Sequence, residues 1–176
     1  MGFRKIFIGL LFMFDFRING FDILPDFIGY IFIFSGLALL VDLNRRFETA
    51  KNFALPLIVV SIFDIYQINV PVDGFFMNPN TFLFSLIGIM STILNILMIY
   101  NICIGIEERA FQLENHDLAR LARSRWTLYL IFQISFLVLF IFKFIALALF
   151  IPLFILSIIV YIMMLSLMST AENQLK

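Results

Sequence analysis

Charged residues are scarce in this chain of 176 residues. Lys, Arg, Asp and Glu together make up 14% of it, whereas 62% of the residues are hydrophobic. A sequence with so little polar surface cannot cover a water-soluble globule, so a lipid bilayer is the expected solvent. The aromatic residues are mostly Phe, 24 against one Trp and five Tyr, which predicts packing groups rather than strong interfacial belts.

The residues that carry most catalytic and metal chemistry are also scarce. Cys103 has no second cysteine with which to form an internal disulfide, and His116 is the one histidine. Neither the ligand spacing of a metal site nor the glycine patterns of nucleotide-binding loops and serine hydrolases occur. We therefore expect a protein that is not an enzyme, with no cofactor, no metal and no nucleic-acid partner.

Four apolar stretches are long enough to cross a bilayer, which takes about 20 residues at 1.5 Å each. They are residues 27–43, 54–70, 82–106 and 127–170. The last stretch is too long for one helix. Lys143, the small residues 146–148 and Pro152 predict a turn inside it, with helices over about 126–144 and 150–169.

The N-terminal stretch 6–14 allows two interpretations. Alone it reaches only about 14 Å, so it crosses the bilayer only if the polar residues 15–24 continue the helix. The sequence therefore predicts an all-α, polytopic transmembrane helix bundle of about six spans. The alternative is five spans plus a re-entrant N-terminal helix.

Clusters of basic residues predict the orientation. The positive-inside rule places the loops at 45–51 and 107–125 in the cytoplasm and the loop at 71–81 outside. With six spans, residues 1–176 form a single domain of the cell membrane with the N- and C-termini in the cytoplasm. Residues 107–125 form a cytoplasmic amphipathic connector, interpreted as a helix on the inner leaflet, an extension of the preceding span or a solvated link.

A few charged residues fall inside or beside the apolar stretches, where a charge costs about 2.5–3.5 kcal/mol on insertion scales. Asp64 is near the predicted midplane and has no basic residue on its own helix. Asp15 and Arg17 are alternatively a local ion pair, and Lys143 alternatively extends its amine to the lipid headgroups. The candidate ligand- or ion-binding residues are Asp64, Lys143, Asp15, Arg17, Gln67 and Asn95.

Small and polar residues recur on one face of the predicted helix over 82–106. Ser85, Gly88, Thr92 and Asn95 follow 3, 4, 3 spacing. Such a face suits either close helix packing or the wall of a polar space.

Residues 16–30, FRINGFDILPDFIGY, resemble the N-terminal signature of small, functionally uncharacterised multi-spanning membrane proteins of Gram-positive bacteria. In size and topology the chain is similar to the substrate-binding subunits of energy-coupling-factor transporters. That resemblance implies six helices, both ends inside and an outward-facing pocket. The chain departs from those subunits in lacking the Ala-x-x-x-Ala pattern on the first helix that docks the coupling subunit.

Two functions are compatible with these features. The first is an integral membrane protein that binds or transports a small solute or lipid through an outward-facing polar cavity. The alternative is a non-catalytic interaction, immunity or regulatory subunit that contacts a membrane protein partner through residues 107–125 and the Ser85 to Asn95 face.

Overall fold

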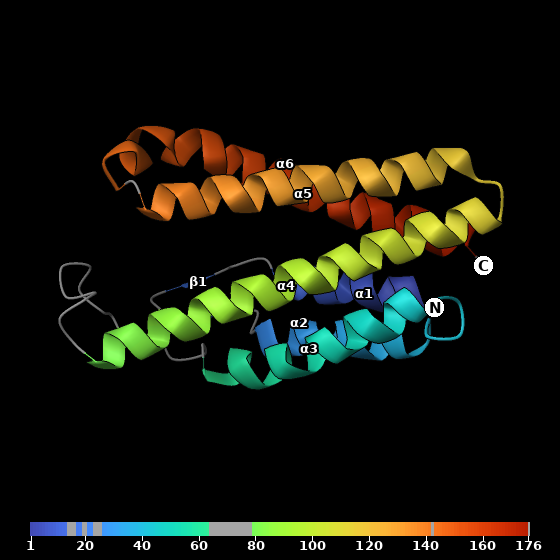
Figure 1. Cartoon of the computed structure of the whole chain (residues 1–176), viewed down its shortest axis with the longest axis horizontal. Coiled ribbons are helices and arrows are strands. Elements are labelled where there is room, and N and C mark those ends of the chain that lie inside the picture. The colour runs from blue at the N-terminus through green and yellow to red at the C-terminus, as the bar shows by residue number, and fades with distance from the viewer. Residues whose placement is uncertain (14–16, 19–20, 23–25, 64–78, 142, 176) are drawn as a thin grey trace.

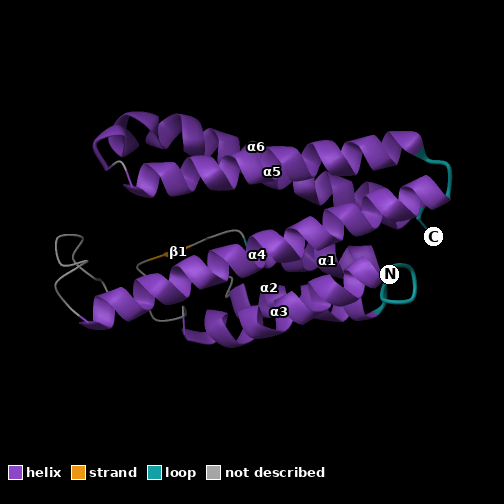
Figure 2. Ribbon diagram, in the orientation of Figure 1, coloured by secondary structure: helices purple, strands orange, loops and turns teal. Residues whose placement is uncertain are grey.

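The chain folds as a helical bundle. A computed structural model describes residues 1–13, 17–18, 21–22, 26–63, 79–141 and 143–175 (Figures 1 and 2). Its helices are α1 (Gly2–Phe12), α2 (Asp26–Ala38), α3 (Arg45–Phe63), α4 (Pro79–Gln112), α5 (His116–Ile141) and α6 (Lys143–Gln174). Two strands of two residues each, β1 (Arg17–Ile18) and β2 (Phe21–Asp22), pair antiparallel between α1 and α2. The predicted helical class is confirmed.

Successive helices pack side by side, and the last helix returns to the first. Each helix contacts the next along the chain, and α6 contacts α1 (Figure 1). The α-ammonium group of Met1 pairs with the Glu172 carboxylate, which also accepts a 3.2 Å hydrogen bond from the Arg4 backbone N–H. The Tyr161 hydroxyl donates a 2.7 Å hydrogen bond to the Leu10 carbonyl. Both termini therefore lie at the same end of the bundle.

Glycines bring α1 and α2 into backbone contact. A Cβ added to Gly9 would lie 2.5 Å from the carbonyl oxygen of Gly29, and one on Gly29 would lie 2.7 Å from that of Gly9. Seven residues along each helix, Gly2 and Gly36 repeat this mutual approach, at 2.9 and 2.7 Å. The two helices can approach this closely only because neither carries a side chain at the crossing points.

The buried core gathers at the end that carries the termini. Buried side chains of α4 run from Met98 to Ala110 and those of α6 from Val160 to Ala171. Phe47 of α3 is fully buried there, edge-to-face against Phe3 at a ring-centroid distance of 5.7 Å. The core thus unites helices from both halves of the sequence.

Two helical segments are long and apolar enough to cross a membrane by length and composition. Within the described residues they are Leu86–Gln112 and Ile151–Gln174. The helix that begins near the N-terminus ends at Phe12 and does not continue toward Leu24, because β1 and β2 follow it. At 11 and 13 residues, α1 and α2 are about 16 and 20 Å long, shorter than a hydrocarbon core of about 30 Å.

The reversal between the last two helices comes earlier than the sequence predicts. α5 ends at Ile141 and α6 begins at Lys143, so residues 146–148 and Pro152 lie within α6. Alanine and leucine at 146–148 are strong helix formers. A proline inside a long apolar helix is tolerated where neighbouring groups satisfy the freed carbonyl.

The connector at 107–125 divides between two helices. α4 runs on to Gln112, and Glu114 adopts a left-handed backbone conformation with φ 57° at the turn. The Asn115 side-chain oxygen then accepts a 3.0 Å hydrogen bond from the Leu118 N–H and caps the start of α5. Residues 107–112 of the connector therefore extend the preceding helix, one of the interpretations that the sequence allows, and residues 116–125 begin α5.

Candidate functional site

The exposed face of three helices changes from polar to apolar along its length. On each helix these exposed residues recur every three or four positions, so each set forms one stripe. The stripe on α3 runs from Arg45, Glu48 and Asn52 to Leu55, Val59 and Ile62. On α5 it runs from Asp117, Arg120, Ser124 and Thr127 to Ile131 and Ile134, and on α6 from Asn173, Ser169 and Ser166 to Ile162, Ile159 and Ile155.

These changes occur at nearly the same level of the bundle. A 3.1 Å ion pair between Arg46 and Glu108 aligns α3 with α4. A 3.0 Å hydrogen bond between the side chains of Asn115 and Gln174 aligns α5 with α6. A 2.8 Å ion pair between Arg123 and Glu107 aligns α5 with α4, and counting 1.5 Å per residue from these three contacts places the three transitions at one level to within about one helical turn. A common transition is the pattern expected where a bundle leaves a lipid layer.

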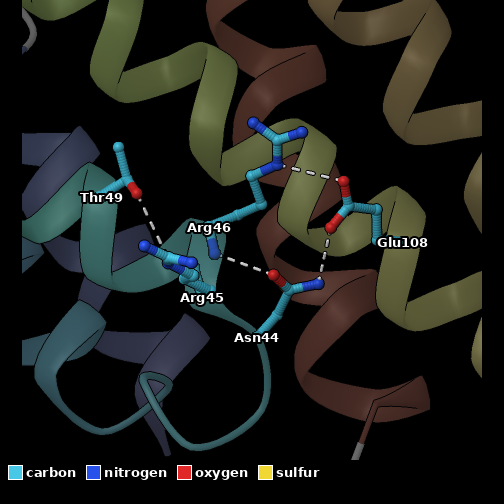
Figure 3. Close-up of a pocket in the computed structure, with 5 residues that line it drawn as sticks. All are labelled: Asn44, Arg45, Arg46, Thr49 and Glu108. Atoms are coloured by element: carbon cyan, nitrogen blue, oxygen red, sulfur yellow. Dashed lines mark hydrogen bonds and ion pairs between the residues drawn. The ribbon is translucent and has the colours of Figure 1, made fainter.

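A polar pocket lies beside the start of α3, on the polar side of this transition. It has a volume of about 470 Å³ and is lined by Asn44, Arg45, Arg46, Thr49 and Glu108 (Figure 3). Asn44 precedes α3, and its side-chain oxygen accepts a 2.8 Å hydrogen bond from the Arg46 N–H. The pocket is therefore built on a helix start that its own first residue caps.

Glu108 of α4 holds two of the pocket residues in place. One carboxylate oxygen accepts a 3.1 Å bond from Nε of Arg46, and the other accepts a 2.9 Å bond from Nδ2 of Asn44. Among the five residues drawn in Figure 3, the Arg46 guanidinium bonds only through Nε, so its two terminal nitrogens donate to none of the other residues that line the pocket. With the neighbouring Arg45, the pocket presents mainly donors and positive charge, which suits an anionic ligand.

A second carboxylate on α4 is buried. Glu107 is 6% exposed, and its Oε1 accepts a 2.8 Å bond from Nη1 of Arg123 on α5. Its Oε2 is shielded and has no hydrogen-bond partner within the described part of the chain. This ion pair ties the beginning of α5 to the end of α4.

The predicted site residues do not converge in the part of the chain that the structure describes. Asp15, Asp64 and Gln67 lie outside the described residues. Arg17 is in β1, where its backbone pairs with Asp22. Lys143 begins α6, at the end of the bundle away from the termini (Figure 1).

Asn95 lies on α4, on the predicted small and polar face. Its Oδ1 is shielded and has no hydrogen-bond partner among the described residues. On the same face, a Cβ added to Gly88 would meet nothing within 4 Å, and Thr92 is exposed. This face is therefore open at Gly88.

Other chemistry is absent from the described ranges. No group of three or more His, Cys, Asp or Glu residues there could hold a metal ion. Cys103 is a free thiol that is fully buried on α4.

Sequence reasoning missed the pocket residues Asn44, Arg46 and Glu108. Asn44 directly before a helix is a recognisable capping signal. The contact between Arg46 and Glu108 joins positions 62 residues apart and has no local signature.

Comparison of the chain with protein-family models, curated proteins and solved structures finds no match.

Proposed function

We propose that this is a multi-pass membrane protein, without enzymatic activity, that binds a small anionic solute in the Asn44 to Glu108 pocket at its cytoplasmic end. The observation that carries the proposal is the orientation of Arg46 in the pocket lining, where Glu108 holds its Nε. Two arginines against one carboxylate leave the pocket lining with a net positive charge, which suits a phosphate or carboxylate.

The proposed orientation combines the stripe transitions with the distribution of charge. Arg4, Lys5, Arg45 and Arg46 lie at the end of the bundle that holds both termini, which is the end that the positive-inside rule places in the cytoplasm. In this arrangement α3 to α6 cross the membrane. α1 and α2 enter from the cytoplasmic side and return, either as two complete crossings or as a re-entrant pair.

Labelling with a membrane-impermeant maleimide separates these two topologies. A Gly20→Cys variant in right-side-out vesicles reacts from outside if residues 13–25 reach the outer surface, and is protected if the pair re-enters. Cys103 is buried and gives little background labelling.

Equilibrium binding of inorganic phosphate and of succinate to the purified protein tests the pocket. Arg46→Gln should weaken binding about 10-fold or more, because a charge-assisted hydrogen bond contributes about 1.5–3 kcal/mol. Lys51→Gln removes the same charge from α3 outside the pocket and serves as the matched control. Equal affinities of these two variants, or no binding by the wild type, would refute the proposal.

We propose separately that a small solute or lipid binds in the outward-facing polar cavity that the sequence predicts around Asp64. It rests on the placement of Asp64 near the middle of an apolar stretch without a basic residue on its helix. If Asp64→Ala folds normally and leaves ligand binding and transport unchanged, that site is wrong.

A second candidate function is a non-catalytic interaction subunit. The open α4 face at Gly88, with Thr92 exposed beside it, favours this alternative because small residues allow a partner helix to approach closely. Purification from native membranes decides between them. A stoichiometric partner that Gly88→Leu releases supports the interaction subunit, and a partner-free protein contradicts it.

A further inference from the structure

The exposed face of α5 combines a cationic part with an apolar part. Arg120, Arg123, Ser124 and Thr127 are exposed on its polar half, and Ile131 and Ile134 follow, 53% and 51% exposed. A phospholipid has the same order of chemistry, with a phosphate, a polar glycerol ester region and an acyl chain. This correspondence is independent of the pocket, which lies between the start of α3 and α4.

Arg123 is held at the surface by a buried anchor. Its Nη1 donates to Glu107 over 2.8 Å, and the side chains of Arg123 and Glu107 are 71% and 9% exposed. The buried Glu107 carboxylate therefore fixes the orientation of the Arg123 guanidinium, while most of the arginine side chain remains exposed. An arginine oriented in this way loses less conformational entropy when it binds a phosphate.

The other two stripes lack this concentration of positive charge. The α3 stripe places Glu48 three residues after Arg45, and the polar part of the α6 stripe contains only Ser166, Ser169 and Asn173. On α5 the nearest exposed acid of the same stripe is Asp117, one turn before Arg120 and farther from the apolar residues. The cationic face therefore lies between this acid and the apolar transition.

The depth of this face fits a headgroup layer. Arg123 lies about 9 Å from the midpoint between Thr127 and Ile131 at 1.5 Å per residue. The headgroup layer on each side of a bilayer is about 5–8 Å thick, within reach of a long arginine side chain.

Aromatic residues mark the same level. Trp126, the one tryptophan of the chain, packs against Tyr100 of α4 at a ring-centroid distance of 5.0 Å and against Tyr129 at 6.3 Å. Tryptophan and tyrosine favour the membrane–water interface, because their rings are apolar and their N–H and O–H groups are polar.

We propose that this α5 face binds an anionic phospholipid of the inner leaflet. Arg120 and Arg123 hold its phosphate, the hydroxyls of Ser124 and Thr127 contact the glycerol region, and Ile131 begins the apolar surface for an acyl chain. The bound lipid fixes the depth of α5 in the membrane.

Thermal unfolding of the delipidated protein in a neutral detergent tests this proposal. A thiol-reactive dye that detects the exposure of the buried Cys103 reports unfolding. Phosphatidylglycerol should raise the midpoint more than phosphatidylcholine with the same acyl chains. Arg120→Gln should weaken the apparent phosphatidylglycerol affinity about 5-fold, since one basic residue near an anionic surface contributes about 1 kcal/mol.

Two control variants distinguish the lipid site on α5 from the pocket at Arg46 and from other basic residues at this end of the bundle. Lys51→Gln removes the same charge elsewhere at this end, and Arg46→Gln disables the proposed pocket; both should keep the wild-type lipid response. Since Arg123 also partners Glu107, Arg120→Glu is the second variant, and it should weaken the response further without breaking that pair.

Three results would overturn the proposal. Equal stabilisation by the two lipids indicates acyl-chain contact without headgroup recognition. An Arg120→Gln response equal to that of Lys51→Gln places the headgroup elsewhere. Stabilisation of the Arg46→Gln variant by inorganic phosphate, equal to its stabilisation by phosphatidylglycerol, indicates a free-anion site on α5 rather than a lipid site.

Discussion

Replacing Gly9 with alanine tests the close packing of α1 on α2. The added Cβ would lie 2.5 Å from the Gly29 carbonyl oxygen, 2.6 Å from Cγ1 of Ile33 and 2.9 Å from its backbone N. Two of these three atoms belong to the backbone, so the helices themselves must separate. Overpacking of this kind costs about 1–3 kcal/mol, and the higher helix propensity of alanine offsets about 1 kcal/mol. We expect a net loss of up to about 2 kcal/mol.

Gly88→Ala is the matched control, because it makes the same chemical change in a helix where nothing lies within 4 Å of the new Cβ. There only the propensity gain applies, so this variant should be about 0.5–1 kcal/mol more stable than wild type. The two variants should therefore differ by about 2 kcal/mol, or about 4–8 °C in the unfolding midpoint for a chain of this size. Thermal unfolding in detergent, followed by the reactivity of Cys103, measures the difference.

A Gly9→Ala protein as stable as Gly88→Ala would refute the reasoning. It would mean that α1 and α2 do not approach at backbone distance in the membrane-derived protein. A loss of stability in both variants would instead point to contacts at Gly88, such as a partner helix on that face.

Three further substitutions test other contacts by the same unfolding assay. Glu108→Gln should cost at most about 1 kcal/mol, since the ion pair that it breaks is about 40% exposed on both sides; a larger loss would show that the pocket is less hydrated than its exposure indicates. Arg123→Ala should be more destabilising than Glu107→Gln, because it leaves a buried carboxylate unpaired whereas the amide removes that charge; the reverse order would contradict the assignment of the buried partner. Tyr161→Phe should cost about 1 kcal/mol by removing the 2.7 Å hydrogen bond to the Leu10 carbonyl that joins α6 to α1, and an unchanged midpoint would show that this bond does not form in solution.

The helical class was predictable because it follows from composition and apolar run length. The stretches that were expected near α2, α4 and α6 correspond to observed helices, although the ends differ by several residues. The N-terminal segment was harder to predict, since the apolar stretch 6–14 is too short to cross a bilayer alone and residues 15–24 are polar for a continuing span. The turn before α6 was placed several residues too late: Lys143 does begin α6, but residues 146–148 and Pro152 lie within the helix, because a proline is a turn signal only where packing does not satisfy the carbonyl that it frees.

The candidate site was much less predictable. Charged residues within apolar stretches pointed to Asp64 and Lys143, but the described pocket is formed by Arg45, Arg46 and Glu108 in regions that looked like ordinary basic connectors. Local sequence shows which residues are costly in a membrane. It does not show which of the exposed charges share an environment.

The sequence by itself determined that the chain is helical and apolar enough for a membrane, because both properties depend on residue types over short windows. The sequence also contains a seven-residue spacing between Gly2 and Gly9 and between Gly29 and Gly36, which is compatible with close helix packing but does not identify the partner helix. Only the tertiary structure decided that these two pairs face each other, that α6 closes against α1 and that Glu108 orients Arg46. These contacts join residues up to 171 positions apart, as between Met1 and Glu172, and such pairs are set by how all six described helices pack at once.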